Sequence, residues 1–426
     1  PLLAEQGYSL YNYGKWHAGP GTAHDLGCAG FSYPGFGNPY TTTEYAAYCR
    51  ARGLEPARFM LEHVFMEDVS PDEPVPGPGY RCQADALHPH VTGVLETPPD
   101  THESFFLANM ACDELRRLAS HRSDRPFFMQ INMWGPHAPY LASPEYVDLY
   151  PPSEISAYGS LGDNLETKPN VYLKEWNRPL ARDNRLIVPS ALPVAEWQRI
   201  LRYLYAHVTQ VDAACGRIVD TLDELGLADQ TLVVWTADHG DAIGSFGGHL
   251  GKEAMLSEEV LRIPLALRWP ERVEANQQSD HLVSTVDVPA ALLDAAGSAF
   301  EGPVHGQSLF DLLPGGQLRS DRETWRQAVV SETHGHHWEP VVGRAVVSDR
   351  YHYAIYQYHG LPDYLEQVDT SFPDQELYDL ASDPYQLDNL AGQARWSDTL
   401  SEMQRHLQTW QQSTDDPVRF SIPQTS

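Results

Sequence analysis

The sequence has 426 residues, with 29 Lys and Arg against 58 Asp and Glu, so its formal net charge is −29. This length exceeds one ordinary hydrophobic core and predicts either a large domain with a smaller one or two mid-sized domains. The charge excludes nucleic acid as a partner of the general surface, and no run approaches the roughly 20 apolar residues of a membrane span. Five cysteines without CxxC spacing exclude a zinc knuckle or a thioredoxin-type motif.

The first 120 residues open with a short aromatic run at 8–13, which predicts a strand. Residues 18–40 are rich in Gly, Pro and aromatic residues and are expected to form a long ordered loop. A helix is predicted at 43–52. Residues 67–100 carry many Pro, Asp and Gly and are expected to be irregular. A second helix is predicted at 101–120, where apolar residues keep a helical period.

The middle of the chain has stronger α/β signals. The apolar run 126–134 predicts a strand, and a second Pro-rich insertion follows at 141–192. Apolar residues at i, i+3/i+4 and i+7 predict an amphipathic helix at 208–225. The next run, 231–237, is apolar throughout, as expected for a parallel strand covered on both faces. Two further elements are predicted by the same criteria, a strand at 263–269 and a helix at 288–296.

The last 100 residues show a different pattern of predicted elements. Short β segments are predicted at 328–332, 344–347 and 351–358, and a helix at 397–412. These segments predict a small antiparallel sheet with a helix. We therefore expect an α/β domain at 1–325 and an α+β subdomain at 326–426.

Polar side chains follow three of the predicted strands at the point where each strand ends: Lys15 and His17, then His137, then Asp238 and His239. Ligands of open α/β sheets bind at the carboxyl ends of the strands, so we expect these side chains to meet in one crevice. Lysine and imidazolium groups suit the oxygens of a sulfate or phosphate group. A carboxylate beside an imidazole suits a divalent cation. The sequence therefore predicts a metal-dependent hydrolase.

A fourth segment, 247–252, ends in Lys252 after a Gly-rich loop and is expected to close over that crevice. Each group also has a plainer interpretation. Asp238-His239-Gly240 suits an N-cap and turn, Lys15 alone suits the surface, and His137 suits a turn. Their joint occurrence at strand ends favours a site.

Two other groups of basic side chains are not assigned to this site. The histidines at 334–337 have irregular spacing for a metal and are expected in a loop that contacts substrate or solvent. Lys168, Lys174 and Arg178, in the second insertion, are expected to be solvated.

Five segments, in the same order along the chain, resemble the sulfatases of the alkaline-phosphatase superfamily. The segments are GKWHAG at 14–19, PFF…GPHAPY at 126–140, LVVWTADHG at 232–240, K…EEVLRIPLALRWP at 252–270 and ELYDL…DP…NL at 376–390. The resemblance implies a central, mostly parallel sheet flanked by helices, with a small C-terminal antiparallel sheet and a helix. It also implies hydrolysis of an organic sulfate ester.

Family roles carry over to matching positions. The resemblance implies that Asp238 and His239 are ligands of a divalent cation, usually Ca²⁺, with Mg²⁺ or Mn²⁺ as alternatives. Lys15 would contact the sulfate and the nucleophile, and His17 would assist the nucleophile as a base. His137 would contact the sulfate or protonate the leaving oxygen. Two more residues would bind substrate: Lys252, and His249 near the place where many relatives carry a His before Gly247.

One element of the family's pattern is not found. Sulfatases use a formylglycine made from Cys or Ser in a C/S-x-P-S-R sequence, whose hydrate attacks sulfur. No such sequence occurs in the 426 residues, and neither does the early strand that ends in an Asp-Asp metal pair. Both lie upstream of the GKWH segment in the family. We therefore expect a missing N-terminal segment to supply them and this chain alone to be inactive.

Three functions remain open from the sequence. The first is hydrolysis of a carbohydrate sulfate, because the insertions at 54–100 and 141–192 and the aromatic loop at 18–40 suit a sugar pocket. The second is a phosphodiesterase or phosphonate monoester hydrolase of the same superfamily. The third is a catalytically inactive truncated member that keeps only a binding pocket.

Overall fold

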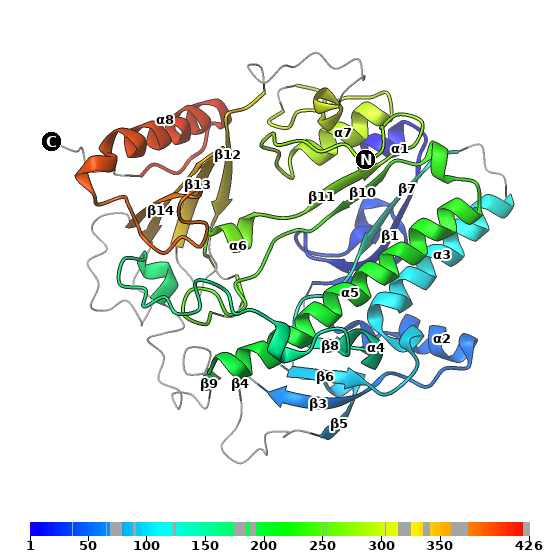
Figure 1. Cartoon of the computed structure of the whole chain (residues 1–426). Helices are drawn as coiled ribbons and strands as arrows, with labels where there is room; N and C mark the ends of the chain where they lie inside the picture. The colour runs from blue at the N-terminus through cyan, green and yellow to red at the C-terminus, as the bar shows by residue number, and fades with distance from the viewer. Residues whose placement is uncertain are drawn as a thin grey trace. The chain divides into compact units, whose positions relative to one another are not determined.

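The computed structural model of the chain (Figure 1) describes residues 1–35, 37–64, 66–68, 79–87, 91–121, 125–173, 185–187, 193–249, 251–252, 254–302, 304–313, 325–334, 341–358 and 374–420. The chain divides into two units, each described by itself. The first comprises 1–157, 180–188 and 192–231, and the second 158–179, 189–191 and 232–426. The boundary expected between 325 and 326 stays a prediction, because the second unit holds residues from both sides of it.

A parallel sheet carries the start of the first unit. Its order is β2 (Ala29–Pro34), β1 (Ser9–Trp16), β7 (Phe127–Asn132), and β1 is parallel to both neighbours. The strands predicted at 8–13 and 126–134 are thereby confirmed. The expectation of a loop throughout 18–40 was wrong, because β2 lies within it. Phe31 and Tyr33, two positions apart, are buried on one face of β2, which is the period of a strand.

A second sheet of the first unit has the order β5 (Tyr80–Gln83), β3 (Arg58–Val64), β6 (Val91–Leu95), β8 (Tyr140–Ala142). β3 is antiparallel to both neighbours, and β6 is parallel to β8. Residues 67–100 were expected to be irregular, which was wrong for β5 and β6. Short strands pair with distant segments there, and their apolar residues pack inward. Two further short strands pair antiparallel, β4 (Met66–Asp68) and β9 (Arg185–Ile187).

Two long helices of the first unit pack side by side, α3 (Glu103–His121) and α5 (Val194–Glu224), as Figure 1 shows. α3 confirms the helix predicted at 101–120, whereas α5 begins before residue 208 because its apolar period continues through Trp197, Ile200 and Leu201. The helix predicted at 43–52 is confirmed as α2 (Thr43–Arg52). α1 (Leu2–Glu5) and α4 (Pro144–Val147) are single turns. In the described part of the chain, no helix combines the length and apolarity that crossing a bilayer requires.

The second unit begins with β10 (Val233–Thr236), which pairs antiparallel with β11 (Leu265–Arg268). Both strands were predicted, but the expectation that β10 is a parallel strand covered on both faces was wrong for the described residues. Its side chains are half-buried or exposed, and Trp235 is 42% exposed. Helix α6 (Glu258–Leu261) lies between the two strands in the sequence. Helix α7 (Asp287–Ala295) follows β11 and confirms the helix predicted at 288–296.

An antiparallel sheet and a helix end the chain, as predicted. The sheet has the order β12 (Ala328–Thr333), β13 (Val341–Ser348), β14 (Tyr351–Tyr358), β15 (Asp374–Asp379). Helix α8 (Ser397–Thr414) packs on this sheet through Leu400 and Leu407, which contact its buried apolar residues. Mixed sheets flanked by helices, with a C-terminal antiparallel sheet and helix, confirm the predicted fold class (Figure 1).

Candidate functional site

The carboxyl ends of β1 and β7 bring three of the predicted residues to one edge of a sheet. Lys15 lies near the end of β1, and His17 directly follows this strand. His137 lies in the loop after β7. Because β1 and β7 are parallel neighbours, both ends face the same edge. Lys15 is half-buried, and His17 and His137 are exposed. An edge of basic side chains of this kind can receive an anionic group from solvent.

Gly14 allows the backbones of β1 and β7 to pack closely at this edge. It lies opposite Asn132 in the β1–β7 ladder with φ of 110°, and a Cβ at this position would overlap the carbonyl oxygen of Asn132. Only glycine allows the two backbones to approach this closely. The Gly in the GKWH segment therefore positions Lys15 and His17 relative to β7.

The loop that carries His137 is held by a buried carboxylate. Glu103, at the start of α3, accepts N–H bonds from Gly135 at 3.1 Å and from Trp134 at 3.4 Å. The backbone N–H of His137 donates to the Trp134 carbonyl at 3.3 Å. The ring Nδ1 of His137 lies 2.8 Å from the carbonyl oxygen of Ala138. The imidazole is thus fixed on its Nδ1 side by its own loop.

Asp238 and His239 follow β10 in the second unit and form an adjacent pair of possible ligands. The carboxylate of Asp238 is 77% exposed, and its Oδ2 lies 3.4 Å from His239 Nε2. Its Oδ1 accepts the backbone N–H of His239 at 3.0 Å. The pair offers one oxygen and one nitrogen donor, which fits part of the coordination shell of Ca²⁺, Mg²⁺ or Mn²⁺.

The third residue of that segment, Gly240, packs against α6. Its N–H donates to the Val260 carbonyl at 2.8 Å, and a Cβ at residue 240 would overlap the carbonyl oxygen of Glu259. Among the described residues, no helix begins at Asp238, so the N-cap interpretation does not hold. The Asp238-His239-Gly240 segment follows β10, and Gly240 lies directly against the backbone of Glu259 and Val260.

The loop after Gly240 folds back on itself. Ala242 N–H donates to the Gly251 carbonyl at 3.2 Å, which places Lys252 beside the chain that leaves His239. His249 is 2% exposed, and its Nε2 lies 2.7 Å from the Tyr172 carbonyl oxygen. Its ring therefore lies in the interior of the loop, and its substrate-binding role stays a prediction. The meeting of all three strand ends also stays a prediction, because they belong to different units.

The expectation of a solvated Lys168 was wrong. Its ammonium group is buried over the rings of Tyr172, Phe246 and Tyr378, 4.5–5.3 Å from their centroids, and donates to the Tyr378 hydroxyl at 3.1 Å. Burial lowers the pKa of Lys168 below its ordinary value, although nearby carboxylates oppose this shift. Lys174 and Arg178 lie outside the described residues. So do residues 335–337, while His334 is exposed beside Glu332.

Sequence reasoning missed a buried cluster in the first unit, formed by His102, Glu103 and His207. Burial lowers the pKa of His102 to about 3. His102 and Glu103 start α3, and His207 lies in the middle of α5. No motif spacing links residues so far apart in the sequence, so the available signal was the polarity of His207 on a largely apolar helix face.

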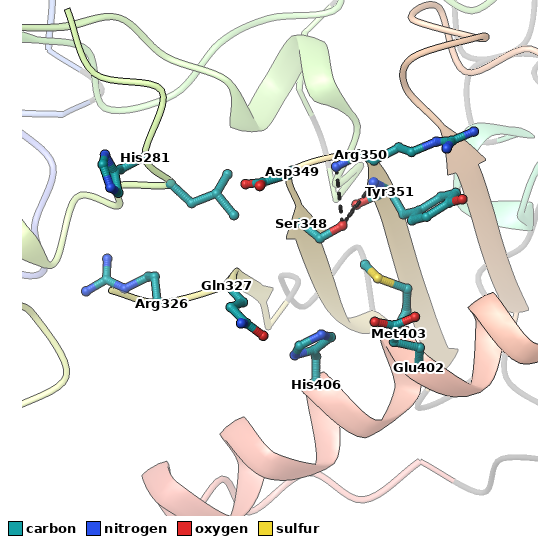
Figure 2. Close-up of a pocket in the computed structure, with 11 residues that line it drawn as sticks. His281, Arg326, Gln327, Ser348, Asp349, Arg350, Tyr351, Glu402, Met403 and His406 are labelled. Carbon is teal, nitrogen blue, oxygen red and sulfur yellow. Dashed lines mark hydrogen bonds between the residues drawn. The ribbon is translucent and has the colours of Figure 1, made fainter. Parts of the chain in front are cut away.

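A pocket of about 380 Å³ lies in the second unit, beside the β13–β14 turn and α8. Figure 2 shows the residues that line it. Its polar lining includes His281, Arg326, Asp349, Arg350, Glu402 and His406. Both guanidinium groups already bind carboxylates, Arg326 that of Asp287 and Arg350 that of Asp379, at 2.6 Å each. The pocket contains none of the residues predicted from the sequence, so it is separate from the candidate site.

Comparison with curated proteins places these features among sulfatases. The N-acetylglucosamine-6-O-sulfatase of Bacteroides thetaiotaomicron is 28% identical over 223 residues, which cover 52% of this chain and 37% of that protein. The N-acetylglucosamine-6-sulfatase of Bos taurus is 26% identical over 306 residues, covering 67% of this chain and 51% of that protein. The chain spans about half the length of the curated relatives it matches.

Solved structures agree on the fold. A protein in complex with its substrate D-glucosamine-2-N,6-O-disulfate gives a TM-score of 0.64 at 17% identity, over 98% of this chain and 82% of that chain. The phosphonate monoester hydrolase of Silicibacter pomeroyi gives 0.66 at 18% identity, over 96% and 78%. At identities this low, the similarity supports the fold alone.

Protein-family models decide the assignment. A model described as N-sulphoglucosamine sulphohydrolase, C-terminal, matches residues 247–413. The model described as Sulfatase matches residues 1–298 and so spans the edge with Lys15, His17 and His137, as well as Asp238 and His239. With more than half of its length matched and an alkaline-phosphatase-like fold, the chain belongs to the sulfatase family.

Proposed function

We propose that this protein hydrolyses organic sulfate esters, and that its substrates are carbohydrate sulfates. The observation that carries the proposal is the edge of basic side chains formed by Lys15, His17 and His137 at the carboxyl ends of two parallel strands. A sulfate group needs positive charge and hydrogen-bond donors where its oxygens gain charge in the transition state. Relatives named for the 6-sulfate of N-acetylglucosamine support a sugar as the alcohol component.

Each side chain has a role that suits its surroundings. Lys15, half-buried, holds the sulfate oxygens and the nucleophile, and Lys252 contributes a second ammonium group. His17 takes a proton from the nucleophile as a general base. His137 is exposed, and its Nδ1 is held by the Ala138 carbonyl, so its Nε2 is the atom that donates a proton to the leaving oxygen.

The same proposal assigns a divalent cation to Asp238 and His239. The exposed Asp238 oxygen and the half-buried His239 nitrogen, 3.4 Å apart, supply two of the ligands, and Ca²⁺ is the ion we favour, with Mg²⁺ or Mn²⁺ as alternatives. When bound, the cation stabilises negative charge on the sulfate oxygens and the nucleophile. The nucleophile is assigned to a formylglycine in a part of the protein outside these 426 residues, which contain no C/S-x-P-S-R sequence.

The substrate class is tested by parallel assays on the full-length protein. An aryl sulfate and an aryl phosphonate monoester with the same leaving group would be compared by kcat/KM. We expect the sulfate to be the better substrate, and N-acetylglucosamine 6-sulfate to release sulfate. A higher kcat/KM for the phosphonate would favour the phosphonate monoester hydrolase alternative, to which the fold is equally similar. No turnover of either ester would favour an inactive binding protein.

The role of this edge of basic side chains is tested by His137→Ala in the same protein. Loss of a general acid lowers kcat by roughly 10²–10⁴-fold. The matched control is His121→Ala, since His121 is an exposed histidine at the end of α3. Equal kcat in His137→Ala and wild type would remove His137 from the reaction.

A further inference from the structure

Three side chains with metal-binding atoms come together in the interior of the first unit. His102 and Glu103 start α3, and His207 faces them from α5; each is at most 2% exposed. Their ligand atoms all lie within 4.8 Å of one another. Two packed helices therefore bring two imidazoles and a carboxylate together in a place that solvent does not reach.

His207 is the member of this cluster whose ring nitrogens form no hydrogen bond within the protein. Both nitrogens are buried. Its Nε2 lies 3.6 Å from Glu103 Oε1, which is too long for a hydrogen bond. Two ligand atoms of one tetrahedral Zn²⁺ lie about 3.4 Å apart, because each bond is about 2.1 Å long. The separation therefore suits two ligands of a shared ion.

His102 has the outer contacts of a metal ligand. Its Nε2 lies 3.2 Å from the Leu141 carbonyl oxygen, and the backbone N–H of Ser104 points to its Nδ1 at 3.3 Å. Nε2 is then the protonated nitrogen, and Nδ1, which accepts the Ser104 N–H, lies 4.0 Å from Glu103 Oε1. A histidine whose second nitrogen donates to a backbone carbonyl is the usual arrangement at metal sites.

Glu103 brings a negative charge into this interior. Its Oε1 accepts from the Ser104 hydroxyl at 2.8 Å and from the Gly135 N–H at 3.1 Å, and both of these donors are neutral. Buried charges in proteins are paired or coordinate metals. The Gly135 backbone packs closely against both side chains, because a Cβ on Gly135 would overlap His207 Nε2 and lie 2.9 Å from Glu103 Oε1.

We propose that His102 Nδ1, Glu103 Oε1 and His207 Nε2 form a buried site for a divalent transition-metal ion of the zinc class. Two imidazoles and one carboxylate suit Zn²⁺ better than Ca²⁺, which takes 6–8 oxygen ligands. The site is thus distinct in chemistry from the cation assigned to Asp238 and His239. Binding requires the His102–Glu103 separation of 4.0 Å to close by about 0.6 Å toward the tetrahedral value. It also requires His102 Nδ1 to exchange the Ser104 N–H for the ion, and the Ser104 hydroxyl, 3.1 Å from Nδ1, to rotate.

Such an ion would join three parts of the first unit. It would link the start of α3 to the middle of α5, and through Glu103 to the Trp134–Gly135 backbone that precedes His137. Its role is structural, because the surrounding burial leaves no path for a substrate of any size to the cluster. The expected consequence of binding is a higher thermal stability of the first unit.

The test measures zinc in the full-length protein after removal of metal with a chelator and dialysis against equal concentrations of Zn²⁺ and Ca²⁺. We expect about one tightly held zinc per chain in the wild type. His207→Gln should lose it, since removing a direct ligand weakens binding by more than the roughly 10–100-fold caused by loss of an outer-shell partner. His406→Gln on α8 is the matched control and should keep the zinc, and Asp238→Asn should keep zinc while losing calcium.

A second measurement covers the case in which His207→Gln does not fold. In the metal-free wild type, Zn²⁺ should raise Tm and Co²⁺ should produce the visible absorption of a four-coordinate ion, whereas Ca²⁺ should do neither. A wild type that holds no zinc and shows no shift would overturn the proposal, and so would a folded His207→Gln variant that still binds zinc as tightly. Neither result depends on whether the protein hydrolyses sulfate esters.

Discussion

Gly7, just before β1, and Gly14, within β1, differ in how much space a side chain would have. Gly14 has φ of 110° and a Cβ would overlap the Asn132 carbonyl oxygen, whereas Gly7 has φ of 87° with nothing within 4 Å of the Cβ position. Both positions disfavour L-residues for the same backbone reason. Only Gly14 adds a collision with a neighbouring strand.

This difference predicts the result of two alanine substitutions. Gly7→Ala should destabilise by about 1–2 kcal/mol, the cost of a left-handed conformation for a residue with a Cβ. Gly14→Ala should destabilise by more, because β1 and β7 must also separate. Urea unfolding midpoints would measure both variants. Equal losses for the two would mean that the β1–β7 contact is less tight than described.

The buried ammonium of Lys168 predicts a stability that depends on pH. Burial lowers its pKa in the folded protein below the ordinary value of 10.5, so between these two values the unfolded chain binds more protons than the folded one. Stability contributed by this position therefore rises as the pH rises toward 10.5. Lys168→Met keeps an apolar stem among Tyr172, Phe246 and Tyr378 but cannot titrate.

We accordingly expect wild type to gain stability relative to Lys168→Met as the pH rises toward the ordinary lysine pKa of 10.5. Urea midpoints measured over that rise in pH would show it. Lys252→Met, at a half-buried position, is the control and should show a smaller slope against wild type. A difference that stays constant with pH would contradict the lowered pKa.

At the scale of elements, a buried ion pair joins the end of α8 to the C-terminal sheet. Arg344 on β13 is fully buried and binds both carboxylate oxygens of Asp416, at 2.8 and 3.1 Å. Burial alone would raise the pKa of Asp416, but the bonds from Arg344, Gln411 and the Val418 N–H lower it below its ordinary value. The pair thus fixes the turn after α8 to the middle of the sheet.

Asp416→Asn should therefore destabilise the protein by about 1–3 kcal/mol, because the buried Arg344 charge keeps only Glu332, at 3.2 Å, as a carboxylate partner. Asp415→Asn is the matched control: Asp415 is exposed, and asparagine tolerates its left-handed backbone, so a change within about 0.5 kcal/mol is expected. Because the folded pKa of Asp416 is lowered, its contribution is present above its ordinary pKa of 3.8 and lost as the pH falls below it. A loss of similar size in both variants would show that the ion pair contributes little.

Sequence patterns predicted the longer helices and the site-bearing strands because their signals are local. The amphipathic period of 208–225 and the apolar runs before His137 and Asp238 lie within single elements. Strands β2, β5 and β6 were missed because each is short and lies in Gly- or Pro-rich sequence, and its stability comes from pairing with a distant segment. The burial of Lys168 was missed for the same reason, since its aromatic neighbours are Tyr172, Phe246 and Tyr378.

At the scale of the whole molecule, the side chains assigned to the proposed reaction are spread along the sequence. Lys15, His17 and His137 belong to the first unit, and Asp238, His239 and Lys252 to the second. The order of motifs along the chain predicted all six, because each follows a strand or a glycine-rich loop that can be recognised locally. The pairing of His102 and Glu103 with His207 depends on how α3 and α5 pack, and for that reason only the structure reveals it.

The central claim is that Asp238 and His239 hold the cation that sulfate-ester hydrolysis requires. Its most direct test is calcium binding by titration calorimetry together with sulfate release, measured on the full-length wild type and on Asp238→Asn. Asp280→Asn, at an exposed acidic position of the same unit, is the control. We predict that Asp238→Asn loses both calcium binding and sulfate release, while Asp280→Asn keeps both. Wild-type calcium affinity and turnover in Asp238→Asn would contradict the account.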